Sequence, residues 1–216
     1  AIIGHIGKSA LAGLSIGSTV LLTTTGLCLF LAYNTTSQVA RLLGAGKRRE
    51  GFSIGMDGLW LALLLGIILT VILIFAAEPL CYAIGARGST LQNAIVYTQM
   101  VMPGLPAMLL VYAANGIFRG LCNVRITLFA AVSGAVLNTI LDVIAVFGLN
   151  MGIAGSGIAT MIAQWYMGLV LTIPAVIWAT QSGARLKPHF QHILHSAGTG
   201  MPLFVRTLAL LSLIHI

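Results

Sequence analysis

Asp142 is the residue of this chain whose type and position point most directly to chemistry. It lies about midway along an otherwise apolar stretch, roughly residues 126–147, and Asn138 precedes it by one helical turn. Thr160 and Gln164 follow on the next apolar stretch. An ionised aspartate in hydrocarbon costs roughly 2.5 to 3.5 kcal/mol, so such a side chain normally faces a cavity or a polar partner. The pattern therefore predicts a functional carboxylate within a membrane.

The neighbouring polar residues suggest what this carboxylate does. Asn138 and Asp142 are four residues apart and share a helix face, and Thr160 follows the next turn at a similar depth. Carboxylate, amide and hydroxyl oxygens suit a small cation or a relayed proton. Hydrogen bonding between helices explains Asn138, Thr160 and Gln164 equally well, but it explains a carboxylate poorly. We expect an ion-coupling or substrate site at Asp142, Asn138, Thr160 and Gln164, with sodium a candidate ligand of the first three.

The overall composition places these residues in a membrane protein. The chain has 216 residues, of which 58% are hydrophobic and 7% are charged, whereas soluble domains carry about 25% charged residues. The net charge of +7 comes from short basic clusters between apolar runs, without the interleaved aromatic residues that would favour a nucleic-acid partner. Three scattered cysteines fit neither a disulfide framework nor a metal site, so we expect them to pack as small apolar residues.

Apolar runs long enough to cross a bilayer, about 20 residues each, divide the chain. The full spans cover roughly residues 11–33, which continue as helix through residue 43, and then 54–77, 94–118, 126–147 and 153–179. A partial span lies at each end, the last opening near Met201. Pro103 and Pro106 remove helix hydrogen bonds and are expected to kink the third full span. We therefore predict an all-α polytopic membrane protein.

Two pairs of glycines predict close packing between helices. Gly13 and Gly17 are four residues apart, as are Gly51 and Gly55, and this small-residue spacing lets membrane helices approach closely. Because the chain has 25 glycines, such spacings also arise by chance. The pairs indicate packing and nothing more specific.

Lysine and arginine counts in the loops predict the orientation. One side receives residues 41–50, 119–125 and 181–197, which hold most of the basic side chains between the spans, whereas the other side receives only Lys8 and Arg87. The more basic side is expected to be cytoplasmic, with the chain in the cell membrane. Asp57 and Glu78 fall near predicted span ends, where we expect water to reach them.

Other motifs fail on the residues they would need. Residues 44–47, GAGK, lack the first glycine and the following Ser or Thr of a phosphate-binding loop. His189, His192 and His195 lie three residues apart with no Cys or carboxylate among them, and they favour a solvated helical face over a metal site. The chain shows no nucleophile in a triad context. We therefore expect neither an enzyme nor a bound cofactor.

Several short motifs resemble the multidrug and toxic compound extrusion (MATE) transporters, closest to the DinF-like branch. They are VARLLGAG at residues 39–46, FRGL at 118–121, NTILD at 138–142, GIAG at 152–155 and AT at 159–160. The resemblance implies a twelve-helix transporter of two six-helix lobes that exports cationic, amphipathic compounds in exchange for protons or sodium ions. It also implies that Asp142, Asn138 and Thr160 form the ion site of the first lobe.

The resemblance also predicts how the chain is divided. Residues 1–180 would hold the first lobe from the end of helix 1 to helix 6, residues 181–197 a cytoplasmic linker, and residues 198–210 the start of helix 7. Residues 211–216, LSLIHI, match the translation of a sequencing adapter and are expected to be an artefact. The second lobe, and an aspartate expected on helix 1, would then lie outside the chain. CNV at residues 122–124 replaces the usual polar-Asp-Thr in a cytoplasmic turn.

Two further functions stay open on the residues alone. A lipid-linked precursor flippase shares this architecture in related families, but it would need a cationic central cavity, and no basic residue lies in the middle of a span. A non-transporting membrane scaffold would show no ion-dependent release of a substrate. The residues do not distinguish proton from sodium coupling, nor do they name the exported compound.

Overall fold

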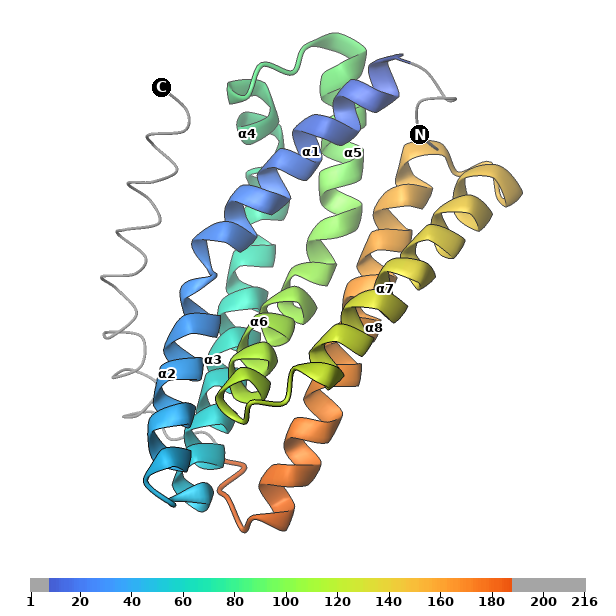
Figure 1. Cartoon of the computed structure of the whole chain (residues 1–216). Helices are drawn as coiled ribbons and strands as arrows, with labels where there is room; N and C mark the ends of the chain where they lie inside the picture. The colour runs from blue at the N-terminus through green and yellow to red at the C-terminus, as the bar shows by residue number, and fades with distance from the viewer. Residues whose placement is uncertain (1–7, 188–216) are drawn as a thin grey trace.

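The chain forms a helical bundle (Figure 1), seen here in a computed structural model that describes residues 8–187. Five stretches in this range are long and apolar enough to cross a membrane, so the predicted all-α polytopic fold is confirmed. In chain order the elements are α1 (Lys8–Leu27), α2 (Phe30–Gly44), α3 (Arg48–Phe75), α4 (Ala77–Ala83), α5 (Gly88–Val101), the 3-10 turn η2 (Met102–Gly104), α6 (Leu105–Gly120), α7 (Val124–Val143), the π-helical turn η3 (Ile144–Gly148) and α8 (Gly152–Gln181).

The third span, made of α5, η2 and α6, is the centre of the bundle. In its most apolar stretch 61% of the residues are buried, against 17% to 33% in the other four spans. α6 packs against α2, α3 and α8, and α5 packs against α1 and α8. Phe118, Met102, Leu105 and Leu109 are among its fully buried side chains. The other helices therefore form a shell around this span, and their outer faces carry the apolar residues that suit lipid.

The third span is kinked where its two prolines lie, as predicted. Pro103 is within η2 and Pro106 begins α6, so this stretch loses two backbone donors. Two carbonyl groups of the kink accept hydrogen bonds from neighbouring helices: the Thr70 hydroxyl donates to the Met102 oxygen at 3.1 Å, and the Trp165 indole to the Pro103 oxygen at 3.0 Å. The kink is thus held by hydrogen bonds from α3 on one side and α8 on the other.

The first span corrects a prediction, because it is not one continuous helix over residues 11–43. α1 ends at Leu27 and α2 begins at Phe30. Just before the break, the hydroxyl groups of Thr24 and Thr25 donate to backbone oxygens one turn earlier, at 2.8 and 2.9 Å, a bond that tends to bend helices. Gly26 adds a residue of poor helix propensity. Thr24, Thr25 and Gly26 therefore explain the break between α1 and α2, which the hydropathy of the segment does not indicate.

The two glycine pairs lie at helix contacts, which confirms their predicted packing role. A Cβ atom on Gly13 would lie 2.7 Å from Cβ of Asn93, and one on Gly17 would lie 2.5 Å from the Tyr97 ring. Both glycines therefore let α1 approach α5 more closely than any side chain would allow. Gly55 gives α3 the same closeness to α6, because a Cβ there would lie 2.9 Å from Ile117.

The connections alternate between two ends of the bundle, as the loop charges predict. Figure 1 shows the α2–α3 turn, the α6–α7 turn and the C-terminal end of α8 at one end, and α4 with the α7–α8 turn at the other. We call the first the basic end, because it carries Arg41, Lys47, Arg48, Arg49, Arg119, Arg125, Arg185 and Lys187. The predicted linker starts where α8 ends. Its residues beyond 187, the three histidines and the predicted last span lie outside the described residues.

Cys122 provides a test of which side of the membrane the basic end faces. It is exposed in the α6–α7 turn, whereas Cys28 and Cys81 are buried. Burial raises the pKa of the Cys81 thiol more than its hydrogen bond with Thr98 lowers it, so at neutral pH little of the reactive thiolate is present there. A membrane-impermeant maleimide should therefore report almost entirely on Cys122.

If the basic end is cytoplasmic, the maleimide labels Cys122 in inverted membrane vesicles and leaves it unmodified in intact cells. Gel-shift of the labelled chain measures the reaction, and a Cys122→Ser variant gives the background from the other two thiols. Strong labelling in intact cells would reverse the predicted orientation.

Candidate functional site

The Asp142 carboxyl group lies on the side of α7 that packs against α8. The side chain is half-buried, and it interacts with the hydroxyl group of Ser156 on α8. Its Oδ1 atom is buried and has no hydrogen-bond partner among the described residues. Ile140, two residues before Asp142, and Val143, directly after it, are 51% and 46% exposed on the outer surface. The carboxylate therefore faces protein while the adjacent apolar residues face the surroundings.

Asn138 and Thr160 contact each other one turn away from Asp142. The Asn138 amide donates to the Thr160 hydroxyl at 3.4 Å, in a half-buried position. Because α7 and α8 run antiparallel, the polar residues form two pairs one helical turn apart. Asp142 is paired with Ser156, and Asn138 with Thr160. The expectation that Asp142, Asn138 and Thr160 come from facing helices at similar depth agrees with this geometry.

Small residues at the start of α8 let the two helices come close enough for these contacts. Gly155 is buried against η3, and a Cβ atom there would lie 3.0 Å from Cβ of Ala145. Directly after Asp142 and Val143 the helix widens into the π-helical turn η3. Single π turns of this kind are uncommon and recur at functional sites. The helix is therefore irregular between Asp142 and the α7–α8 turn.

Gln164 contacts a different element from the other predicted site residues. It is 5% exposed, and its Oε1 atom is so close to Gly104 of η2 that no side chain would fit at that position. Oε1 has no hydrogen-bond partner among residues 8–187. Gln164 therefore faces the kink of the third span, whereas Asn138 and Asp142 face α8 from the other side.

Ser156 is a site residue that the sequence reasoning missed. It is 4% exposed and interacts with Asp142. The signal was present, because Ser156 and Thr160 are four residues apart and share a helix face. Serine next to glycines at a helix start, however, is usually interpreted as a turn residue.

The oxygen atoms of this site can hold a small cation or a proton. Asp142, Asn138, Ser156 and Thr160 supply carboxylate, amide and hydroxyl oxygens, the donors that hard cations prefer, and the unpartnered Oδ1 atom of Asp142 is a free acceptor for either. Residues 8–187 contain no group of three or more His, Cys, Asp or Glu side chains suited to a metal ion. Oxygen donors of this kind favour a hard cation over a soft transition metal.

The two other acidic residues near span ends differ from each other. Glu78 is exposed in the first turn of α4, where water reaches it as predicted. Asp57 needs a correction, because its side chain is only 6% exposed. The chain after α8 folds back over α3 at this point, as shown by the hydrogen bond from the Arg185 amide to the Ser53 hydroxyl at 3.1 Å. A contact this distant in sequence leaves no trace in local hydropathy.

Comparison with known proteins decides the family. The MatE family profile matches residues 1–144, which is more than half of the chain. The chain belongs to the MatE family. The resemblance drawn from the short motifs is thereby confirmed, and with it the expected fold.

Relatives of this MatE chain include proteins from bacteria and plants. It is 24% identical over 210 residues to the multidrug export protein MepA of Staphylococcus saprophyticus, covering 95% of this chain and 47% of that protein. It is 28% identical over 191 residues to the DNA damage-inducible protein F of Escherichia coli, covering 87% and 42%. It is 38% identical over 115 residues to Protein DETOXIFICATION 43 of Arabidopsis thaliana, covering 52% and 22%. The chain spans at most about half the length of these relatives.

Solved structures of MATE transporters share the fold. A MATE crystal structure in the bent conformation superposes with a TM-score of 0.83 at 24% identity, covering 96% of this chain and 47% of that one. An inward-facing multidrug resistance MATE family transporter gives the same score and identity, covering 96% and 48%. The MatE chain described here therefore has the fold of about half of such a transporter.

Proposed function

We propose that this MatE chain is the N-terminal lobe of a secondary antiporter that exports cationic or amphipathic compounds in exchange for protons or sodium ions. The observation that carries the proposal is Asp142, a carboxylate between two membrane-crossing helices with one buried oxygen that no group among residues 8–187 satisfies. The name of the relative MepA, a multidrug export protein, supports export as the direction. The basic end would face the cytoplasm, and the second lobe would complete the transporter.

In the proposed mechanism, the charge state of Asp142 decides which conformation is favoured. An inward-moving ion binds at Asp142 and removes its negative charge. If the ion is sodium, Asp142, Asn138 and Thr160 hold it; if it is a proton, the carboxyl group itself takes it up. An ion drives a conformational change only when it binds the two states with different affinity, and the closely packed α7–α8 contact is where the two states would differ.

The substrate enters this scheme as a competitor for negative charge. While Asp142 is ionised, the lobe attracts a cationic compound; once the ion neutralises Asp142, that attraction is lost and the compound leaves. One carboxylate can therefore couple the inward flow of the ion to the outward release of the drug without any direct contact between the two.

The alternatives differ from this proposal in what they require of the charges. A flippase for pyrophosphate-linked lipids needs basic side chains at mid-depth, but every Lys and Arg from 8 to 187 lies at or near the end of a helix. A scaffold needs no charge inside the membrane and gives no reason for Asp142. The antiporter accounts for the acid and for the position of the bases.

The test is transport by the intact transporter reconstituted in liposomes loaded with ethidium, a fluorescent organic cation. We expect an imposed sodium or proton gradient to accelerate ethidium movement, and the matching ionophore, monensin or a protonophore, to abolish that acceleration. The gradient that works identifies the coupling ion. If neither gradient accelerates ethidium or another organic cation, the antiporter proposal is wrong and a scaffold is favoured.

A further inference from the structure

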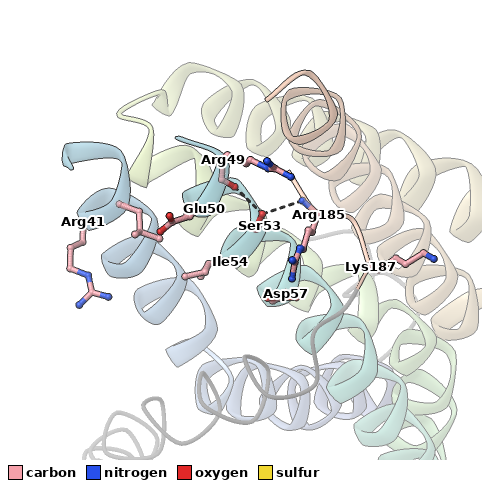
Figure 2. A pocket seen from close by; sticks show the side chains of 9 residues that line it. Arg41, Arg49, Glu50, Ser53, Ile54, Asp57, Arg185 and Lys187 are labelled. Atoms are coloured by element: carbon pink, nitrogen blue, oxygen red, sulfur yellow. Dashed lines mark hydrogen bonds between the residues drawn. The ribbon is translucent and has the colours of Figure 1, made fainter. Parts of the chain in front are cut away.

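A charged cavity opens at the basic end, away from the Asp142 site (Figure 2). It has a volume of about 590 Å³ and lies between α2, α3 and the chain that follows α8. Its lining includes four basic side chains and two acidic ones: Arg41, Arg49, Arg185, Lys187, Glu50 and Asp57. The proposed transport mechanism makes no use of this cavity.

The charges of the cavity do not cancel. Positive side chains exceed negative ones by two among the lining residues. Glu50 is in addition paired with Lys47 at 3.2 Å, and Asp57 lines the cavity with only 6% of its surface exposed. Figure 2 shows the Arg185 side chain directed toward Asp57. The cavity therefore retains a positive surplus that a bound anion would satisfy.

A short segment, residues 185–187, forms the wall of this cavity, and we call it the strap. Two hydrogen bonds fix it to α3: the Arg185 amide donates to the Ser53 hydroxyl at 3.1 Å, and the Trp60 indole donates to the Leu186 oxygen at 2.9 Å. Ser53 in turn donates to the Arg49 oxygen at 2.8 Å. Each of the first two bonds joins a backbone atom of the strap to a side chain of α3. The strap therefore has a defined position relative to that helix.

The strap separates the charged cavity from an apolar groove. Arg185 and Lys187 line the cavity, whereas Leu186 between them lines the groove, as expected when side chains alternate along an extended segment. The groove has a volume of about 290 Å³ and an almost wholly apolar surface, lined by Met56, Leu59, Trp60, Leu63, Leu110, Thr172, Val176 and Leu186. It continues along α3 one to two turns deeper than the cavity.

We propose that the cavity and the groove together bind one anionic phospholipid. Its phosphate lies within the cavity that Arg41, Arg49, Arg185 and Lys187 line, and one acyl chain follows the groove beside Trp60. A basic pocket at the cytoplasmic ends of membrane helices is the arrangement that recognises anionic headgroups, and tryptophan favours the same depth at the membrane surface. A zwitterionic lipid would add a positive charge to a cavity that already has a surplus.

The test is native mass spectrometry of the full chain in detergent, titrated with dioleoyl-phosphatidylglycerol. Each basic residue near a membrane surface contributes several-fold to anionic lipid binding, so the double variant Arg185→Gln, Lys187→Gln should weaken it about tenfold or more. Arg125→Gln is the matched control, because it removes a charge at the same end but outside the cavity. Arg49→Gln provides a second cavity variant that leaves the strap sequence intact.

Each outcome of the titration decides the proposal. Binding that is weaker in the cavity variants, unchanged in Arg125→Gln and absent with dioleoyl-phosphatidylcholine supports it. Equal binding of both lipids, or equal loss in all variants, shows a nonspecific charged surface and overturns it. Competition by inorganic phosphate at concentrations similar to those of the lipid would assign the cavity to a soluble anion instead. The absence of saturable phosphatidylglycerol binding would also overturn the proposal.

Discussion

Replacing Asp142 by asparagine is expected to reduce gradient-driven export by the intact transporter to the rate of protein-free liposomes. Asparagine keeps the size and the hydrogen bonding of the side chain, so α7 can still pack against Ser156 on α8. It cannot change its charge, and a site that binds the ion equally in both conformations shifts no equilibrium. The measurement is ethidium movement under the gradient that drives the unaltered protein.

Two controls separate lost coupling from lost folding. Glu78→Gln also removes one carboxylate, but from an exposed position in α4, and transport should stay near the unaltered rate. Size-exclusion profiles and membrane levels of Asp142→Asn should match those of the unaltered protein, because the substitution removes a charge from an apolar setting. Undiminished gradient-driven export by Asp142→Asn would remove this residue from the coupling site.

Replacing Gly66 by alanine is expected to destabilise the bundle by about 1 to 3 kcal/mol, the usual cost of adding a group to a packed interior. A Cβ atom at this position would lie 2.5 Å from Cα of Pro106 and 3.1 Å from its backbone nitrogen. Neither atom can move without shifting the kink of the third span, so α3 and α6 must separate. The loss of stability is large because the added Cβ atom of α3 would meet backbone atoms of Pro106, which cannot move aside as a flexible side chain can.

The thermal midpoint of the detergent-purified chain measures this effect, and in a chain of this size about 1 kcal/mol corresponds to roughly 2 to 4 °C. Gly26→Ala is the matched control, because a Cβ atom there meets nothing within 4 Å. Alanine favours helix over glycine, so this variant should keep or raise the midpoint. Equal midpoints for the two variants would show that α3 and α6 are not packed as tightly as described.

The five membrane spans within residues 8–187, and the ends of the bundle at which they connect, could be predicted from hydropathy and loop charge. Bilayer-length apolar runs leave few alternatives to a helix, and the proline pair correctly placed the kink of the third span. The break after Leu27 could not be predicted in this way, because threonine and glycine within an apolar run do not lower its hydropathy enough to end it. Hydropathy reports whether a segment prefers the membrane to water. It does not report where the backbone hydrogen bonds of a helix are interrupted.

The candidate site could be predicted in part. Asp142 stands out because a carboxylate within an apolar run is costly, and Asn138 and Thr160 follow from helix periodicity and from the short turn between their helices. The same periodicity gave no reason to separate Gln164, which faces η2. Which face of α8 meets α7 and which meets the third span is decided by tertiary packing. The burial of Asp57 has the same origin, since the strap comes from a distant part of the chain.

The two interruptions of the membrane helices differ in what restrains them. The one at Met102–Gly104 is tied on both sides, by Thr70 and by Trp165, so straightening it would sacrifice two hydrogen bonds where water cannot replace them. The one after Gly26 has open space beside it, and bending there displaces little. The kink in the third span is therefore restrained by hydrogen bonds from two helices, whereas a side chain at Gly26, beside the interruption of the first span, would meet no neighbouring atoms. Within these two spans, bending is therefore expected at the interruption of the first span rather than at the kink of the third.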